Sequence, residues 1–406
     1  MRSYIPRAYL LFLLPLLAAG PTGATRSVPA VQTSEPYTIR DLGRLPGFET
    51  TVVRGINSKT QVVGFCQGGK DPDTGYPLVR GFVWEDGKMV PLPTLGGPNS
   101  YAYGVNGRGE VAGDADTSDH RYPVVWRQKR VPGSLTGTPG SAVVLNDEGL
   151  AAGAARGGYL VLLGPDSSWQ SIPFGDNVRV TVTGMNAKAH VVGWAEIRLD
   201  GGGKETHAFL VREGQIERLR SLGGRGEKAY GLSSDGRVVG SAECSDGVWQ
   251  ACLWYRGQVY DLETPEGWSS NATAINASGV VVGTITDPKR GLARACIWRE
   301  GKLADLNTLI PPASGWELET AVGINDSGTI VGSGKRNGQA EAFYMKPPAP
   351  PLPRSFCGFA VGSGSRSTTA TSGTSANAGA CLGIGNSVVR GASVVAGYSA
   401  GPVAAR

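Results

Sequence analysis

The chain has 406 residues, of which 40% are hydrophobic, 18% are charged and 61 are glycine. This composition is too apolar for a disordered chain and too rich in glycine for a helical protein. The formal net charge is +5, with Arg2 and Arg7 supplying two of the positive charges, and the remaining sequence contains no basic run. Composition and charge therefore argue against nucleic-acid binding.

The first 24 residues have the pattern of a cleaved signal peptide. Arg2 and Arg7 precede an apolar run, and the small residues 22–24 suit cleavage after Ala24. A membrane anchor is the competing interpretation, but an apolar run of about 12 residues is short against the roughly 20 that span a bilayer as a helix. We expect a protein without a membrane span that is exported to the periplasm, the cell surface or the medium. Residues 25–36 are expected to form a linker.

Residues 37–346 carry a repeated pattern in which an apolar residue precedes Asn and a Gly follows seven residues later. Leu232-Ser233 is a degenerate copy of the first landmark. The pairs of landmarks are Asn57 and Gly64, Asn106 and Gly113, Asn146 and Gly153, Asn186 and Gly193, Ser233 and Gly240, Asn276 and Gly283, and Asn325 and Gly332. Successive first landmarks lie 49, 40, 40, 47, 43 and 49 residues apart, which is the period of propeller blades rather than of short solenoid turns.

The residues between and after the landmarks predict four strands in each repeat. In segments such as 106–109, the leading Asn can accept a backbone hydrogen bond and the closing Gly can adopt a positive φ, as in a hairpin turn with a Gly bulge. A continuous apolar run such as 82–84 indicates a strand buried on both faces, and a short run such as 260–262 closes the unit. We therefore predict an all-β fold, a seven-bladed β-propeller of four-stranded antiparallel blades.

The two ends of the repeated region predict how the ring closes. The last repeat runs into proline after its third strand, at residues 342–345. Residues 37–42 match the missing fourth strand and precede the first repeat. We expect this N-terminal strand to complete the last blade, which would remove exposed strand edges. Residues 347–406 are predicted to form a Pro-rich linker and a disordered, low-complexity tail.

Several of these segments resemble the HAF-repeat family of extracellular bacterial repeat proteins. The resemblance lies in the segment 207–209 (His-Ala-Phe), the Leu-Gly-Gly loops at 95–97 and 222–224, the Ile-Asn turns and the Val-Val-Gly strands. It covers about residues 37–346 and implies secretion and a repeated architecture. It supplies no catalytic residues.

The sequence predicts no cofactor and no metal site. The six cysteines lack the paired spacing of zinc ligands, and no loop shows the Asp ladder of a calcium site. Cys252 and Cys296 occupy a position where other repeats have Phe, so we interpret them as small buried hydrophobes. A disulfide between Cys244 and Cys252 across a hairpin is left open.

No catalytic constellation is evident. Residues 397–401 fit the nucleophile-elbow pattern around Ser399, but neither Asp nor His follows it. His207 and His190 are interpreted as structural or exposed residues, and His120 is the histidine that we consider for ligand contact.

Binding is expected on one rim of the propeller. Loops between the second and third strands emerge on the same face as the loops between blades, and these are the long, variable segments. Aromatic and charged side chains there could stack on sugars or contact a protein. The candidate binding residues are Tyr76 with the nearby Asp71 and Asp73, then Asp119, His120, Arg121, Trp249, Asp287, Arg290 and Trp316.

We predict a secreted, monomeric, non-catalytic binding or interaction module for an unknown glycan or protein ligand. The alternative is an extracellular polysaccharide hydrolase or lyase with carboxylates that converge from several blades. Two carboxyl groups about 5 to 9.5 Å apart in a cleft would favour that enzyme. A structural role in a surface layer is a third interpretation.

Overall fold

Every regular element of the described chain is a β-strand, apart from two short 3-10 helices, η1 (Leu306–Leu309) and η2 (Pro312–Ser314). The computed structural model describes residues 36–72, 75–128, 140–166 and 168–348. The predicted signal peptide and nearly all of the linker and tail therefore lie outside the described residues, as do Asp73 and Ser399. No helix in the described ranges is long and apolar enough to cross a membrane.

Antiparallel sheets follow the sequence repeats, with successive strands paired in each. The first three repeats form β2 (Thr50–Ile56), β3 (Val62–Lys70), β4 (Pro77–Glu85), β5 (Lys88–Pro91); β6 (Ser100–Val105), β7 (Val111–Asp116), β8 (Arg121–Trp126); and β9 (Gly140–Leu145), β10 (Ala151–Ala155), β11 (Tyr159–Leu163), β12 (Trp169–Pro173). The second repeat shows three strands, and the residues that follow them, 129–139, are outside the described ranges.

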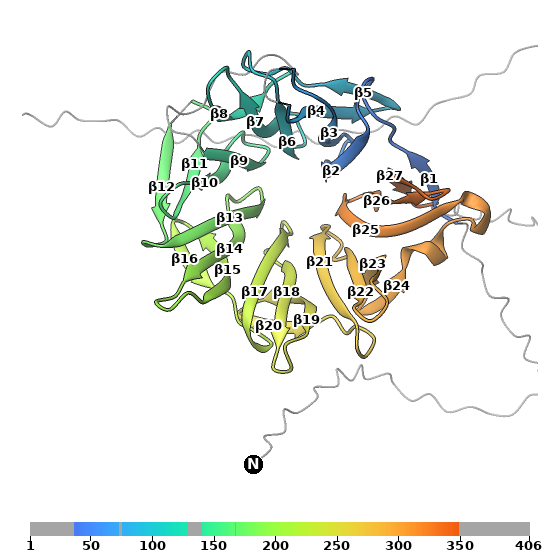
Figure 1. Ribbon diagram of the computed structural model, residues 1–406. Helices are drawn as coiled ribbons and strands as arrows, with labels where there is room; N and C mark the ends of the chain where they lie inside the picture. The colour runs from blue at the N-terminus through green and yellow to red at the C-terminus, as the bar shows by residue number, and fades with distance from the viewer. Residues whose placement is uncertain (1–35, 73–74, 129–139, 167, 349–406) are drawn as a thin grey trace, which may run out of the picture. The chain divides into compact units, whose positions relative to one another are not determined.

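The remaining repeats continue this pattern. They form β13 (Val178–Met185), β14 (Val191–Arg198), β15 (Lys204–Arg212), β16 (Gln215–Arg218); β17 (Gly223–Leu232), β18 (Val238–Cys244), β19 (Trp249–Tyr255), β20 (Gln258–Asp261); β21 (Ser269–Ile275), β22 (Val281–Asp287), β23 (Leu292–Arg299), β24 (Lys302–Asp305); and β25 (Trp316–Ile324), β26 (Ile330–Arg336), β27 (Gln339–Lys346). A single parallel pairing, Thr206 with Gly226, joins the fourth and fifth repeats into one eight-stranded sheet. Figure 1 shows the first strand of each repeat facing a central space.

The N-terminal strand completes the last sheet, as expected. β1 (Thr38–Asp41) pairs antiparallel with β27, with Thr38 opposite Lys346 and Asp41 opposite Phe343. The resulting order is β1-β27-β26-β25, so residues from the two ends of the repeated region share one four-stranded sheet.

The hydrophobic core is divided into clusters that lie between neighbouring repeats. One cluster joins Val63 of the first repeat to Trp126 of the second. Another joins Val331 of the last repeat to Val62 and Trp84 of the first. The tryptophans of the third strands, at 84, 126, 254 and 298, are all buried, as predicted. Both faces of each sheet are therefore covered by the adjacent repeats, which explains the continuous apolar runs.

The repeated Asn forms its hairpin turn as predicted and also bonds the next repeat. The Asn106 side-chain oxygen accepts hydrogen bonds from the backbone N–H groups of Arg108 at 3.1 Å and Glu110 at 2.9 Å. The amide nitrogen of the same side chain donates to the Asn146 carbonyl at 2.9 Å. The corresponding bonds are Asn57 to Asn106 at 2.8 Å, Asn186 to Ser233 at 3.3 Å, Asn276 to Asn325 at 3.2 Å and Asn325 to Asn57 at 3.1 Å.

The disulfide that the sequence left open is not formed. Cys244 and Cys252 are both free thiols. Cys252 lies opposite Gly240, four residues before Cys244 on β18, so the two sites are about 13 Å apart along the strand. Cα atoms more than about 7 Å apart cannot be bridged without backbone movement. Cys252 and Cys296 are fully buried, which agrees with their interpretation as small hydrophobes.

Candidate functional site

The first strand of each repeat contains a β-bulge at a constant position. In β2, Val53 pairs with Gly64 and Gly55 pairs with Val63, so Arg54 between them has no partner in the ladder. The unpaired residue lies three positions before the turn Asn or Ser in every repeat. These bulge residues are Arg54, Tyr103, Val143, Thr183, Tyr230, Thr273 and Val322.

The repeat glycine makes the bulge sterically feasible. A Cβ atom built on Gly64 would lie 2.0 Å from the Val52 carbonyl oxygen, and one on Gly113 would lie 1.9 Å from that of Tyr101. The same close approach occurs at Gly193, Gly240, Gly283 and Gly332. Only glycine lets the second strand approach the bulged first strand this closely.

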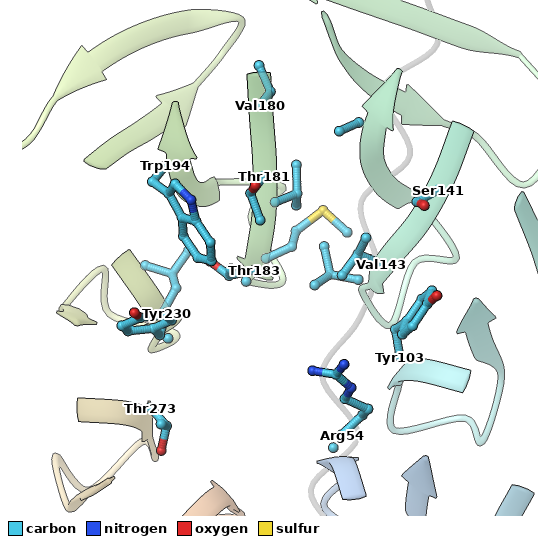
Figure 2. A pocket seen from close by; sticks show the side chains of 18 of the residues that line it. Arg54, Tyr103, Ser141, Val143, Val180, Thr181, Thr183, Trp194, Tyr230 and Thr273 are labelled. Atoms are coloured by element: carbon cyan, nitrogen blue, oxygen red, sulfur yellow. The ribbon is translucent and has the colours of Figure 1, made fainter. Parts of the chain in front are cut away.

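All seven bulge residues line one cavity of about 1460 Å³. The cavity receives one such side chain from each repeat because each first strand is innermost (Figure 1). Figure 2 shows Trp194 and Tyr230 on one side of this central cavity, with Tyr103 and Arg54 on the other.

The two ends of the central cavity differ chemically. The first strands end at the Asn turns, so the apolar residues just before those turns line one end. They include Ile56, Met185, Leu232, Ile275 and Ile324. The opposite end is formed by the β7–β8 and β10–β11 hairpins and by the start of β13. Its charged side chains are those of Asp119, Arg121, Arg156 and Arg179.

Four arginines and one carboxylate, Asp119, are the charged side chains among the described residues of the lining. Arg54, Arg156 and Arg179 are exposed. None of these three has a carboxylate at ion-pair distance within the described ranges. The central cavity therefore carries an excess of positive charge.

Arg121 is held in place from two sides. Its Nε donates to Asp116 Oδ1 at 2.8 Å, and its Nη2 donates to the Tyr101 hydroxyl at 2.9 Å. The guanidinium lies 4.1 Å from the Tyr101 ring centroid. Partial burial alone would lower the pKa of Arg121, but the hydrogen bond to Asp116 and the charge interactions with Asp116, Tyr101 and Tyr103 together outweigh it, and the pKa is raised. Arg121 is thus a fixed cation at the rim.

A buried carboxylate stands behind the wall formed by Tyr103 and Ser141. The Tyr103 hydroxyl lies 3.3 Å and the Ser141 hydroxyl 3.0 Å from Asp114 Oδ2, and both donate to it. Burial, with a further contribution from Asp114, raises the pKa of Tyr103. The Tyr103 phenol therefore stays protonated across the physiological pH range.

The opposite wall carries an aromatic cluster from the fourth and fifth repeats. The Trp194 and Tyr230 rings form an edge-to-face pair with centroids 5.4 Å apart. The Lys228 ammonium lies 5.6 Å from the Trp194 ring and 5.5 Å from the Trp249 ring. This cation helps to hold the rings, and Trp194 and Tyr230 line the central cavity.

The structure brings together part of the predicted binding set. Asp119, His120 and Arg121 line the central cavity at its rim. Trp249 is half-buried over Lys228, behind the lining. Tyr76 is 74% exposed on the β3–β4 connection, and the Arg290 side chain is 78% exposed beside Asp287.

Two predicted contact residues are core residues instead. Trp316 is 8% exposed because it begins β25 and packs edge-to-face against Phe343, with centroids 6.1 Å apart. Asp287 ends β22 and is buried, and its Oδ1 accepts the backbone N–H of Lys289 at 3.0 Å. The expectation that these two side chains are exposed on the rim is wrong.

The bulge residues were missed by the sequence reasoning. Their signal was a position of variable chemistry three residues before each landmark Asn or Ser. No group of His, Cys, Asp and Glu in the described ranges could hold a metal ion.

Comparison with known proteins shows similarity to solved structures in fold but does not assign the chain to a family. No protein-family model and no curated protein matches this sequence. Among solved structures, Pyrococcus horikoshii acylaminoacyl peptidase is similar, with a TM-score of 0.51 at 10% identity over 74% of this chain and 53% of the peptidase. The chain thus spans about half the length of that protein, and a likeness at this identity concerns the fold alone.

Weaker similarity extends to two further structures. YCF48 bound to D1 peptide matches with a TM-score of 0.47 at 11% identity, over 80% of this chain and all of that one (100%). TolB from Acinetobacter baumannii matches with a TM-score of 0.39 at 12% identity, over 77% of this chain and 80% of TolB. The fold class is all-β, with four-stranded antiparallel sheets in a propeller-like arrangement.

Proposed function

We propose that this protein is an exported, monomeric, non-catalytic binding module, a closed seven-bladed β-propeller whose central cavity holds the ligand. Export is supported by the signal-peptide pattern of the first 24 residues and by the resemblance to HAF-repeat proteins.

The closed ring is supported by contacts between the first and last repeats. Asn325 donates to the Asn57 carbonyl at 3.1 Å, as Asn57, Asn106, Asn186 and Asn276 donate to the repeats that follow them. Val331 and Ala342 of the last repeat share a hydrophobic cluster with Val62 and Phe82 of the first. The first repeat thus packs on the last in the same way as on the second.

The observation that carries the proposal is the set of bulge residues. Each repeat places one unpaired residue of the same register position in the central cavity, and these side chains include Arg, Tyr, Thr and Val. A bulge re-aims a side chain without changing the rest of the ladder. The architecture therefore keeps the scaffold constant while the cavity lining varies, which suits selective binding.

The alternative is an extracellular polysaccharide hydrolase or lyase, and the central cavity offers less to the hydrolase. Hydrolysis of a glycosidic bond ordinarily uses two carboxyl groups on either side of that bond. Asp119 is the one carboxylate among the described lining residues, and Asp114 is buried behind Tyr103 and Ser141. The geometry thus favours binding as the first hypothesis to test.

Filling the central cavity tests this function. We would screen the purified chain against glycan and peptide arrays, then repeat each positive interaction with Val143→Trp and Val322→Trp. Both side chains lie at bulge positions, so the larger ring would enter the cavity rather than the core. Val143→Ala and Val322→Ala serve as matched controls. We expect the Trp variants to lose binding by at least about tenfold with little change in Tm.

Three results are distinguishable. Loss of binding in the Trp variants alone supports a ligand seat in the central cavity. Equal binding by the Trp variants would place the ligand elsewhere on the surface. The absence of any ligand for the wild-type chain would contradict the binding module and favour a structural role.

A further inference from the structure

Three guanidinium groups without an ion pair in the described ranges, and an aromatic wall, define the chemistry of the central cavity. We propose that the cavity binds an acidic glycan, with Arg156 and Arg179 contacting its anionic groups at the rim and Trp194 and Tyr230 contacting a sugar ring. This inference rests on the proposed function and specifies its ligand class.

The rim arginines converge because of the topology. Arg121 lies on β8 next to the β7–β8 hairpin, Arg156 in the β10–β11 hairpin and Arg179 near the start of β13. All three positions are at the end of the central cavity opposite the Asn turns, in three consecutive repeats. The rim is therefore an arc of cations rather than a single positive charge.

Two of these cations are available to a ligand. Arg121 is already paired with Asp116, whereas neither Arg156 nor Arg179 has a carboxylate at ion-pair distance within the described ranges. Arg179 lies opposite Glu196 on β14, but the Glu196 carboxylate pairs with Lys204 at 2.9 Å. A guanidinium presents a planar set of donors that matches a carboxylate or sulfate in a bidentate geometry. Arg54, at its bulge deeper in the cavity, adds a third guanidinium without an ion pair, and its guanidinium lies 5.5 Å from the Phe65 ring centroid.

The opposite wall is suited to a sugar ring. Trp194 and Tyr230 are both half-buried and line the central cavity as an edge-to-face pair. Lys228 holds Trp194 from within the cluster, so the indole is pre-positioned. Fixed aromatic side chains supply large contact area at low entropic cost.

The strand edges argue against an extended peptide as the ligand. A peptide that adds to a sheet edge needs an uninterrupted row of backbone hydrogen-bonding groups. Six of the first strands, β2, β6, β9, β13, β21 and β25, are edge strands facing the central cavity, and β17 is joined to β15 by one parallel pairing. All seven are interrupted by their bulges. Recognition in the cavity therefore depends on side chains rather than on strand pairing.

Calorimetric titration of the full chain with defined oligomers tests this proposal. The probes are tetragalacturonate, which carries carboxylates, sulfated maltotetraose, neutral maltotetraose and tetraglutamate. We expect one or both acidic glycans to bind, with tetraglutamate and maltotetraose at least about tenfold weaker. We also expect binding to weaken as salt increases, because rim charges are screened.

Variants of the cavity residues identify which side chains bind the acidic glycan. Arg156→Gln and Arg179→Gln should each weaken binding of the acidic glycan by about tenfold, the effect of losing one charge-assisted hydrogen-bonding group. Arg212→Gln, an exposed arginine of the fourth repeat outside the cavity lining, is the matched control and should bind normally. Trp194→Leu should weaken binding of both acidic glycans alike.

The negative results are specific. Equal or tighter binding of maltotetraose, insensitive to the Arg variants, would overturn the anionic class. Equal or tighter binding of tetraglutamate would overturn the assignment of a glycan as the ligand class. Lack of binding by both acidic glycans at about 5 mM would also overturn this inference. In each case the proposed binding function stands if the Val143→Trp variant loses binding of some other ligand. The proposed function fails if this variant loses binding of no ligand.

Discussion

Gly64 shows how a single atom fixes the local backbone in each repeat. Its missing Cβ leaves room for the Val52 carbonyl oxygen, which would otherwise lie 2.0 Å from that atom. In the same sheet, Gly55 has only ordinary contacts at 3.6 Å with the Tyr103 carbonyl oxygen and with Val63. The two glycines therefore serve as a matched pair.

We predict that Gly64→Ala destabilises the fold by about 2–4 kcal/mol, because backbone rather than a flexible side chain must move. Gly55→Ala should change the free energy of unfolding by less than about 1 kcal/mol. Urea denaturation of both variants measures the difference. Equal losses in the two variants would show that the close approach at Gly64 does not determine stability.

The third-strand tryptophans provide a second residue-scale comparison. The Trp254 indole N–H donates to the Arg220 carbonyl at 2.6 Å, whereas the buried indole N–H of Trp298 has no partner within the described ranges. We predict that Trp254→Phe costs about 1 kcal/mol more than Trp298→Phe, because only the first leaves a carbonyl without its donor. Thermal unfolding of the two variants checks this, and a larger loss for Trp298→Phe would contradict it.

At the scale of single elements, the hairpins of the repeats were predictable and their bulges were not. The landmark Asn and the Gly that closes the turn, such as Asn106 and Gly109, predict a hairpin because both residue types are favoured by the turn geometry. Arg54 and its counterparts gave no such sign, since an unpaired residue in a first strand differs from its neighbours only in register. The rim residues 119–121 were found because hairpin loops follow from strand order.

Errors in the predicted site have a common origin. Trp316 and Asp287 were assigned to loops, yet they lie at the beginning of β25 and the end of β22, inside the packed sheets. Strand ends are the least predictable part of a strand, because side chains packed between neighbouring repeats extend the ladder beyond its local signals.

The hairpin of the fifth repeat contacts the sixth repeat through a different side chain from the Asn used in other repeats. Ser233 stands where other repeats have Asn and has no amide to donate to the next repeat. Instead, Arg237 Nη2 donates to the Ala277 carbonyl of the sixth repeat at 3.1 Å. Asp235 accepts from Arg237 Nε at 2.9 Å and so orients the guanidinium.

This substitute contact should depend on pH. The hydrogen bond from Arg237 lowers the pKa of Asp235 to about 2 from the ordinary 3.8. Because the pKa of the folded state is the lower one, the contribution to stability is present above pH 3.8 and is lost as pH falls through about 2. The Asp235 side chain is 46% exposed, so the contribution is about 0.5 kcal/mol after solvent screening.

We predict that Asp235→Asn is slightly less stable than the wild type from pH 7 to pH 5. The gap should narrow below pH 4 as the wild-type carboxylate is protonated. Denaturation curves at each pH measure it, with Asp326→Asn in the hairpin of the seventh repeat as a comparison. A gap that persists unchanged at pH 2 would show that Asp235 does not act through its charge.

At the scale of the whole molecule, the proposed ring and the central cavity depend on each other. The repeat period and the spare strand at residues 37–42 predicted the number and order of the units. The cavity lining required coordinates, because residues that line it are separated by a whole repeat in sequence. Lining residues of the first and last repeats, such as Arg54 and Val322, come together only if those two repeats meet.

An engineered disulfide between the first and last repeats tests directly whether these two repeats are in contact. A Cβ atom on Gly323 would lie 3.2 Å from Ile56 Cγ2, so Ile56→Cys with Gly323→Cys places two thiols across the closing junction. Gly184→Cys with Leu232→Cys occupies the equivalent positions at an internal junction, where the Cβ would lie 3.5 Å from the Leu232 nitrogen. Under mild oxidation, peptide mapping by mass spectrometry should find both pairs linked within one chain and to a similar extent. An internal pair that oxidises while the closing pair stays reduced would contradict the closed ring, and with it the central cavity as the binding site.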